Sequence, residues 1–119
     1  RGVRIIYGDR SLAMISGTAS INNKGEVVHV GNIEKQTLRM LENVKVLLNE
    51  AGMDFENMAH AIVYLRDLAD FPLVAKIFDE CLPNVPRVVT LAPVCRPTWL
   101  IEMECMAVKA EDNPQFKKL

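Results

Sequence analysis

The residues best suited to chemistry are an arginine and a glutamate in the last apolar segment, residues 85–108. Arg87 leads one β-rich run, and Glu102 lies inside the next, fifteen positions later. Charged side chains in such strands are costly unless they are paired or used. The guanidinium can bind a carboxylate through two parallel hydrogen bonds, and a glutamate among apolar neighbours can act as a base. The same two residues can equally form a structural salt bridge at a subunit interface.

The other titratable side chains are weaker candidates. Glu104 alternates with apolar residues in the same run as Glu102, so both carboxylates point to one face of a strand. His29 has no Asp, Cys or Ser at a spacing that would indicate a catalytic partner, which favours a surface or structural histidine. His60 falls on one face of a strand, where we expect a packed or interface residue.

The chain that must position these residues reads as strands and helices in the order β-β-α-β-α-β-β. Hydrophobic patterning and turn residues predict the boundaries. Two helices separated by a strand should lie on one face of a mixed sheet. Apolar residues occur on both faces of the predicted strands, so we expect the other face to be buried by oligomerisation. The predicted strands are 3–7, 12–16, 58–65, 87–94 and 99–109, the helices 32–51 and 67–81, and residues 27–30 a short strand or extended loop.

Helix start and stop signals fix the two helices. Asn32 is a predicted N-cap, and Gly52 stands where a C′ glycine ends a helix. Asp67 begins the second helical region, with Asp70 three residues later resembling a capping arrangement. Pro72 is tolerated in a first turn.

Composition narrows the classes of function. At 119 residues the chain forms one domain, and its net charge of −1 gives no basic excess for binding nucleic acid. No apolar run approaches the roughly 20 residues of a membrane span. Three cysteines without CxxC spacing suggest free thiols in a reducing cytoplasm. Residues 110–119 read as a polar tail with weak structure.

Several local strings, taken in order, resemble the RidA (YjgF) family, historically also called endoribonuclease L-PSP or translation inhibitor proteins. No single string is specific, but their joint order and spacing cover residues 2–109. Residues 1–109 therefore read as one RidA-like domain. The strings are Ile15-Ser16-Gly17, Gln36, Leu41-Glu42-Asn43-Val44, Ala51-Gly52, Val63-Tyr64-Leu65-Arg66-Asp67, Asp70-Phe71, Pro86-Arg87 and Ile101-Glu102-Met103-Glu104 with Ala107.

The resemblance implies an α+β, chorismate-mutase-like fold and a homotrimer whose three sheets form an internal barrel. It places the ligand sites in clefts between subunits. Active members of the family hydrolyse reactive enamines and imines, such as 2-iminopropanoate, to 2-keto acids and ammonia. No metal or organic cofactor is implied, and the expected partners are a small carboxylate or imino acid and further copies of the chain.

Residue by residue, the resemblance makes Arg87 the carboxylate-binding arginine and Glu102 the pocket glutamate. It makes Gly17 the glycine whose backbone contacts the ligand. The pocket position two after the arginine, often cysteine in the deaminases, is Val89 here. The family's pocket tyrosine would lie just before Arg1 and is absent from the sequence. Glu104 then becomes a structural residue rather than a base.

Three functions stay open from the sequence. The first is a deaminase, in which Arg87 holds the substrate and Glu102 activates water. The second is a non-catalytic binder of small carboxylates, which Val89 and the missing tyrosine favour. The third is a RidA-like domain of a larger chorismatase-type enzyme, which the string ISGTASI and Cys95-Arg96-Pro97 motivate. Ribonuclease activity finds no support, because the sequence has no basic patch and its two histidines are not paired.

Overall fold

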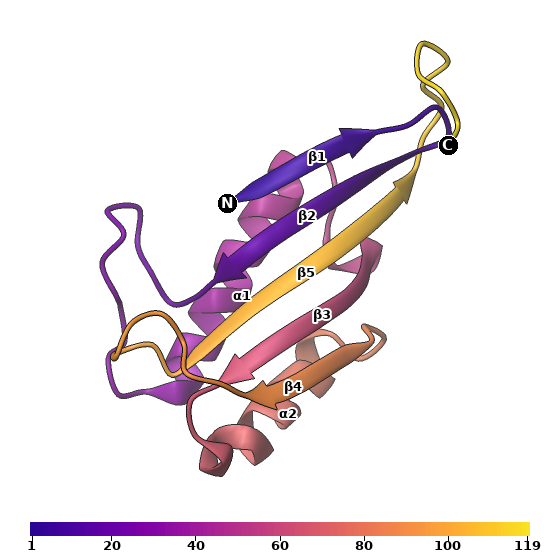
Figure 1. Cartoon of the computed structure of the whole chain (residues 1–119). Helices are drawn as coiled ribbons and strands as arrows, with labels where there is room; N and C mark the ends of the chain where they lie inside the picture. Colours follow the sequence, from indigo (N-terminus) through magenta and orange to yellow (C-terminus); the bar gives the residue numbers. More distant parts are fainter.

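The fold is one mixed β-sheet with two α-helices on a single side of it (Figure 1), as the sequence predicts. A computed structural model of the chain describes residues 1–119. The five strands lie in the order β1-β2-β5-β3-β4. Only the β3–β4 pair is parallel. The elements are β1 (Gly2–Ile6), β2 (Arg10–Thr18), α1 (Ile33–Glu50), β3 (Met58–Leu65), α2 (Phe71–Cys81), β4 (Arg87–Leu91) and β5 (Ile101–Ala110), with 3₁₀ turns η1 (Phe55–Asn57) and η2 (Leu68–Asp70).

The two helices begin and end largely where the capping signals predict. The side chain of Asn32 accepts a hydrogen bond from the Lys35 backbone N–H at 2.9 Å, and Gly52 follows α1 with a φ of +75°. The second helical region starts with η2, in which Asp67 accepts from the Ala69 backbone N–H. Because Asp67 caps this 3₁₀ turn, α2 itself begins later, and the Asp70 side chain makes no capping bond.

The two strands that flank Pro93 and Pro97 are shorter than predicted. Strand β4 ends at Leu91 rather than at residue 94, and β5 begins at Ile101 rather than at residue 99. The connection between them contains Pro93 and Pro97, which have no N–H to donate to a neighbouring strand. Residues 27–30 form neither a strand nor a fully extended loop: Val27 makes a single β-bridge to Ile21, and the chain then bends at His29, whose φ is 62°.

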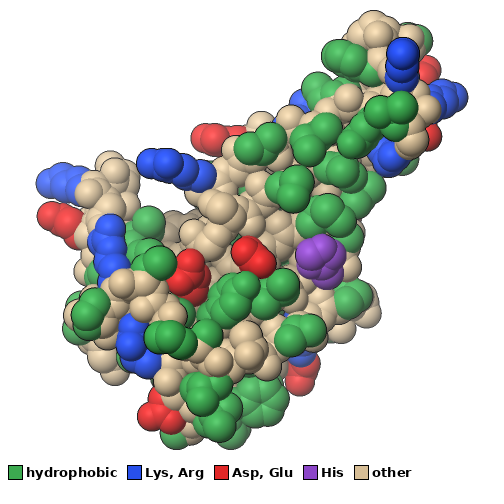
Figure 2. Space-filling view, viewed as in Figure 1, with side chains coloured by type: hydrophobic (Ala, Val, Ile, Leu, Met, Phe, Trp, Pro, Cys, Tyr) green, Lys and Arg blue, Asp and Glu red, His purple; other side chains and the backbone are tan.

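The two faces of the sheet differ in what covers them. The face toward α1 and α2 carries the core, in which Val63, Ile101 and Met103 are fully buried. The opposite face, here called the open face, carries no helix (Figure 1). Figure 2 shows hydrophobic side chains spread over it, with acidic ones among them near its centre. Strand register assigns to the open face Val3, Ile5, Leu12, Met14, His60, Ile62, Tyr64, Val88, Thr90, Glu102, Glu104, Met106 and Val108.

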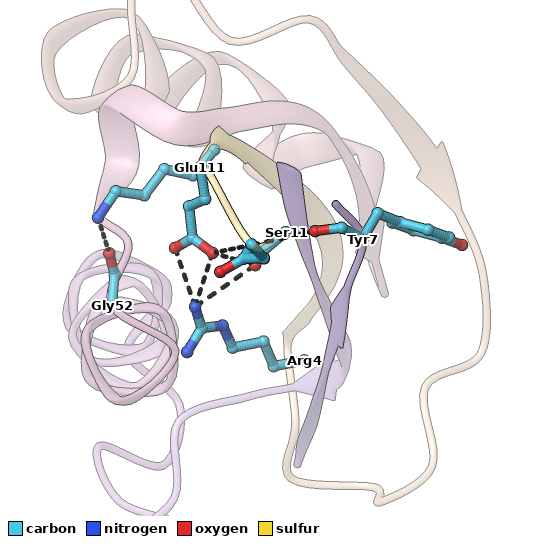
Figure 3. A network of polar contacts seen from close by, with 7 residues as sticks. Arg4, Tyr7, Ser11, Gly52 and Glu111 are labelled. Atoms are coloured by element: carbon cyan, nitrogen blue, oxygen red, sulfur yellow. Dashed lines mark hydrogen bonds and ion pairs between the residues drawn. The ribbon is translucent and has the colours of Figure 1, made fainter. Parts of the chain in front are cut away.

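The covered face becomes polar beyond the end of α1. Arg4 of β1 forms an ion pair with Glu111 at 2.9 Å, and the fully buried Ser11 hydroxyl also donates to that carboxylate (Figure 3). The Nζ of Lys109 donates to the carbonyl of Gly52 at 2.8 Å, which ties β5 to the helix end. Hydrogen bonds from Ser11, from Asn113 and from Arg4 lower the pKa of Glu111.

Strand β5 extends to Ala110, the first residue of the predicted tail. Residues 111–119 contain no helix or strand, yet they are hydrogen-bonded to the β1–β2 turn. Gly8 donates to the carbonyl of Lys117 at 2.9 Å and accepts from the Asn113 N–H at 2.9 Å. A Cβ on Gly8 would overlap the carbonyl of Phe116. The hairpin and the tail therefore form one projecting arm of the molecule (Figure 1).

Candidate functional site

Glu102 lies on the open face, directly against Gly17. Strand β2 shifts register against β5 between Ile15 and Thr18, and Gly17 falls within this irregularity. A Cβ on Gly17 would overlap the Oε1 atom of Glu102. The glycine thus lets the half-buried carboxylate approach the backbone at the end of β2. Both residues were predicted to be site residues, and the structure brings them together.

Glu104 has a different partner from Glu102, although both point to the open face as predicted. The hydroxyl of Tyr64 donates to Glu104 at 3.1 Å. Burial raises the pKa of Tyr64, and the hydrogen bond to Glu104 raises it further. Glu102 forms none of the ion pairs within the protomer. Glu104 therefore has a side-chain partner in the protomer, whereas Glu102 has no ion-pair partner there.

A buried glutamine joins two loops at the Glu102 end of the sheet. Gln36 of α1 is fully buried; its amide donates to the carbonyls of His29 at 3.2 Å and Thr98 at 3.0 Å. Its carbonyl accepts from the Leu100 N–H at 3.0 Å. One side chain of the covered side thus fixes the loop before α1 and the loop before β5.

Arg66, at the end of β3, fixes the second of these loops. Its Nε donates to the carbonyl of Trp99 at 2.8 Å, and its Nη2 to those of Val94 at 3.1 Å and Arg96 at 2.7 Å. These carbonyls lie in the proline-rich connection between β4 and β5, which itself forms no strand. Neither Arg66 nor Gln36 is predicted from the sequence to have a role in the site. A charge directly after an apolar strand, and a glutamine on the buried stripe of a helix, are the signals that point to them.

Trp99 closes the space between the two loops. It forms a small buried cluster with Ala19 and Val94, and Tyr64 packs against this cluster. The guanidinium of Arg96 lies 5.2 Å from its ring centre and donates to the carbonyl of Gly25 at 2.6 Å. The indole Nε1 is buried and has no hydrogen-bond partner. The loops 19–31 and 92–100 therefore form one unit, packed through Trp99, beside the strand that carries Glu102.

Arg87 lies on the other face of the same sheet. It is opposite Ala61 in the β3–β4 register, and Ala61 is opposite the buried Cys105. Its guanidinium is 5.5 Å from the ring centre of Phe78 in α2. Glu102 is opposite Tyr64 on the open face. One protomer therefore does not bring Arg87 and Glu102 together.

The remaining predicted positions have separate surroundings. Val89 is partly buried and packs against the core on the covered face, so its assignment to a binding pocket stays a prediction. His60 is exposed on the open face, as expected for a sheet-face residue, and His29 lies in a loop with a φ of 62°. No group of three or more His, Cys, Asp or Glu side chains is arranged to hold a metal ion. No helix is both long and apolar enough to span a membrane.

All three cysteines are free, as predicted. Cys81 and Cys95 are exposed, whereas Cys105 is buried. Burial and the nearby Glu104 raise the pKa of the Cys105 thiol to about 11. Cys105 is therefore a protonated core side chain at neutral pH, not a nucleophile.

The mixed five-stranded sheet with two helices on one face places the chain among the α+β proteins. The family model described as endoribonuclease L-PSP matches residues 3–109. The chain belongs to this family, which is the RidA/YjgF family predicted from the sequence.

Named relatives and solved structures agree with this assignment. The chain is 29% identical over 99 residues to the 3-aminoacrylate deaminase RutC of Acinetobacter baylyi, covering 82% of the chain and 79% of that protein. It is 31% identical over 112 residues to a RutC family protein of Saccharolobus solfataricus, covering 92% and 86%. The structure of RidA from a Psychrobacter species superposes with a TM-score of 0.77 at 21% identity, covering 89% and 84%, which concerns the fold alone.

Proposed function

We propose that the chain is an enamine/imine deaminase that converts reactive 2-imino acids into 2-keto acids and ammonia. The observation that carries the proposal is the half-buried Glu102 carboxylate, held against the backbone of Gly17 and engaged by no basic side chain of its own protomer. A relative of the chain is named for the deamination of 3-aminoacrylate. An enamine of that kind tautomerises to an imine, which is the form that water attacks.

The site requires a second copy of the chain. Arg87 and Glu102 face opposite sides of one sheet, so Arg87 of one protomer can meet Glu102 only of another. The exposed apolar side chains of the open face, such as Val3 at 61% and Met14 at 50% exposure, favour a partner on that face. We propose a homotrimer with one site in each cleft between protomers.

In this mechanism Arg87 binds the substrate carboxylate through charge-assisted hydrogen bonds, each worth about 1.5–3 kcal/mol. Glu102 accepts a proton from water as the water oxygen bonds to the imine carbon. That proton then passes to the imine nitrogen, which gives a carbinolamine. Glu102 next takes the hydroxyl proton of the carbinolamine and returns it to the amine nitrogen, so that the C–N bond breaks and ammonia leaves as the C=O bond forms. A positioned general base of this kind contributes about 10²–10⁴-fold in rate.

The test measures ammonia and keto acid released from a freshly generated 2-imino acid. We expect Glu102→Gln to lower kcat by about 10²-fold or more, because the amide cannot take up the proton. Glu104→Gln is the matched control, since it removes a carboxylate from the same strand and face. Equal rates for Glu102→Gln and the parent would refute the assignment of the base.

A non-catalytic carboxylate binder is the second candidate, and a specific observation favours it. Val89 packs into the core and brings no polar group where the deaminases often have cysteine. Binding of a keto acid that Arg87→Ala abolishes, with no ammonia release above the uncatalysed rate, would select this function over the first.

A further inference from the structure

Arg87 is oriented by an aromatic ring and two backbone carbonyls of its own protomer. Its ring partner Phe78 lies under the guanidinium, with 5.5 Å between the guanidinium carbon and the ring centre. Its Nη1 donates to the carbonyls of Leu82 at 3.3 Å and Val85 at 3.5 Å. The side chain is only 18% exposed. These contacts orient the arginine and leave its Nη2 directed elsewhere.

The Nη2 of Arg87 donates to the Oδ1 of Asp79, an ion pair within the protomer. The Asp79 side chain is 70% exposed, whereas that of Arg87 is 18% exposed. Asp79 also lies in the last turn of α2 (Phe71–Cys81), where the helix dipole disfavours a negative charge. Such a carboxylate returns to water at little cost, because it is already largely solvent-exposed in the ion pair.

We propose that Asp79 is an internal competitor, which occupies the Arg87 guanidinium until the carboxylate of a ligand displaces it. The inference rests on the proposed function, in which Arg87 binds that carboxylate. It identifies a residue that sets affinity and selectivity: a ligand must carry a negative charge to replace Asp79, and a neutral analogue gains nothing. Asp79 does not position Arg87, because Phe78 and two carbonyls already do so.

The test is the binding of pyruvate to the whole chain. Binding is monitored by NMR, through the shifts of the backbone amide signals and of the Arg87 Nε–H signal during a titration. We expect Asp79→Asn to bind pyruvate about two- to fivefold more tightly than the parent, the range that an exposed ion pair permits. Glu80→Gln is the matched control: it removes one charge from the same helix turn, and Glu80 forms no ion pair. Its affinity should stay within about 1.5-fold of the parent, given the screening of exposed charges.

A ligand control separates competition from general electrostatics. Pyruvamide lacks the carboxylate, and its binding should be the same in the parent and in Asp79→Asn. The proposal that Asp79 competes with the ligand would be overturned by either of two results. One is unchanged or weaker pyruvate binding by Asp79→Asn, and the other is an equal gain in pyruvate affinity in Glu80→Gln.

Arg87→Ala distinguishes this failure from failure of the proposed function. If Arg87→Ala no longer binds pyruvate and Asp79→Asn does not bind it more tightly than the parent, only the role proposed for Asp79 is wrong. If Arg87→Ala binds pyruvate like the parent, or if no variant binds it, the function assigned to Arg87 is wrong and the competitor with it.

Discussion

The two faces of the sheet use the same strands for opposite purposes. In β5, Ile101 and Met103 are fully buried under the helices, while Glu102 and Glu104 alternate with them and reach the open face. The covered face completes its packing within one protomer. The open face leaves a carboxylate beside Gly17 and large apolar side chains such as Val88, which is 61% exposed.

This difference shows why the proposed site needs more than one protomer. The arginine that could bind a carboxylate is on the covered side against α2, and the carboxylate that could act as a base is on the open side. A strand places neighbouring side chains on opposite faces, so no change within the sheet can join the two groups. Association of protomers is the step that can.

Substitution of two methionines of β5 is the strongest test of the difference between the covered face and the open face. Met103 is fully buried on the covered face, and Met106 is half-buried on the open face. We expect Met103→Ala to lower the free energy of unfolding by about 2–5 kcal/mol at any protein concentration, because it leaves a cavity. The same loss should be smaller for Met106→Ala and should depend on protein concentration, because that residue lies where a second copy would pack.

Chemical denaturation at several protein concentrations measures both effects. A loss for Met106→Ala that equals that of Met103→Ala and does not vary with concentration would contradict the distinction between the faces. The two variants make the same chemical change in one strand, so only the face differs.

The second prediction concerns Gln36, which extends from the covered side to the loops beside Glu102. Gln36→Leu keeps the volume but leaves the Leu100 N–H and two carbonyls without their partner. We expect a loss of about 1–3 kcal/mol in the free energy of unfolding. The neighbour Thr37 is the control: it is also fully buried, but its hydroxyl bonds to Ile33 within its own helix. Thr37→Val should cost less than Gln36→Leu, and the reverse order would contradict the bridging role.

Much of the covered face follows from local sequence. The apolar spacing, Asn32 and Gly52 are enough to delimit α1, because a cap and a C′ glycine act within a single turn. The alternation in β5 places Glu102 and Glu104 on one face for an equally local reason. These predictions are confirmed because neither depends on a distant part of the chain.

The side on which Arg87 lies does not follow from local sequence. Strand β4 reads RVVTL, with apolar residues on both faces, so its pattern does not say which side is covered. The answer comes from the parallel register with β3, which pairs Arg87 with Ala61. The Asp79 contact depends on that register and on α2 together, and the Gln36 and Arg66 bonds depend on loops with no periodic pattern. Tertiary geometry therefore decides the parts of the site that spacing cannot.

The third prediction tests whether Gly17 serves the open-face carboxylate. A Cβ at this position meets the flexible end of Glu102, which can move away, so Gly17→Ala should change the free energy of unfolding by no more than about 0.5 kcal/mol. If Glu102 is the base, its displacement should lower kcat by about tenfold, since a misplaced group loses its alignment. A double variant with Glu102→Gln should show no further loss. An additive loss in the double variant would mean that Gly17 acts on something other than Glu102.

The smallest effect is expected at the polar end of the covered face. Hydrogen bonds from Ser11, from Asn113 and from Arg4 lower the pKa of Glu111 from an ordinary value of 4.5. A carboxyl whose pKa is lower in the folded state stabilises the fold above its unfolded pKa, and this stabilisation disappears as the pH falls through the folded pKa. Glu111→Gln should therefore reduce stability at pH 7 and flatten its decline below about pH 4.5, which urea denaturation across this range measures. Glu80→Gln breaks no ion pair, so its free energy of unfolding should fall with decreasing pH as steeply as that of the parent. An equal flattening in Glu80→Gln would show that net charge, not the Arg4–Glu111 contact, governs the loss of stability in acid.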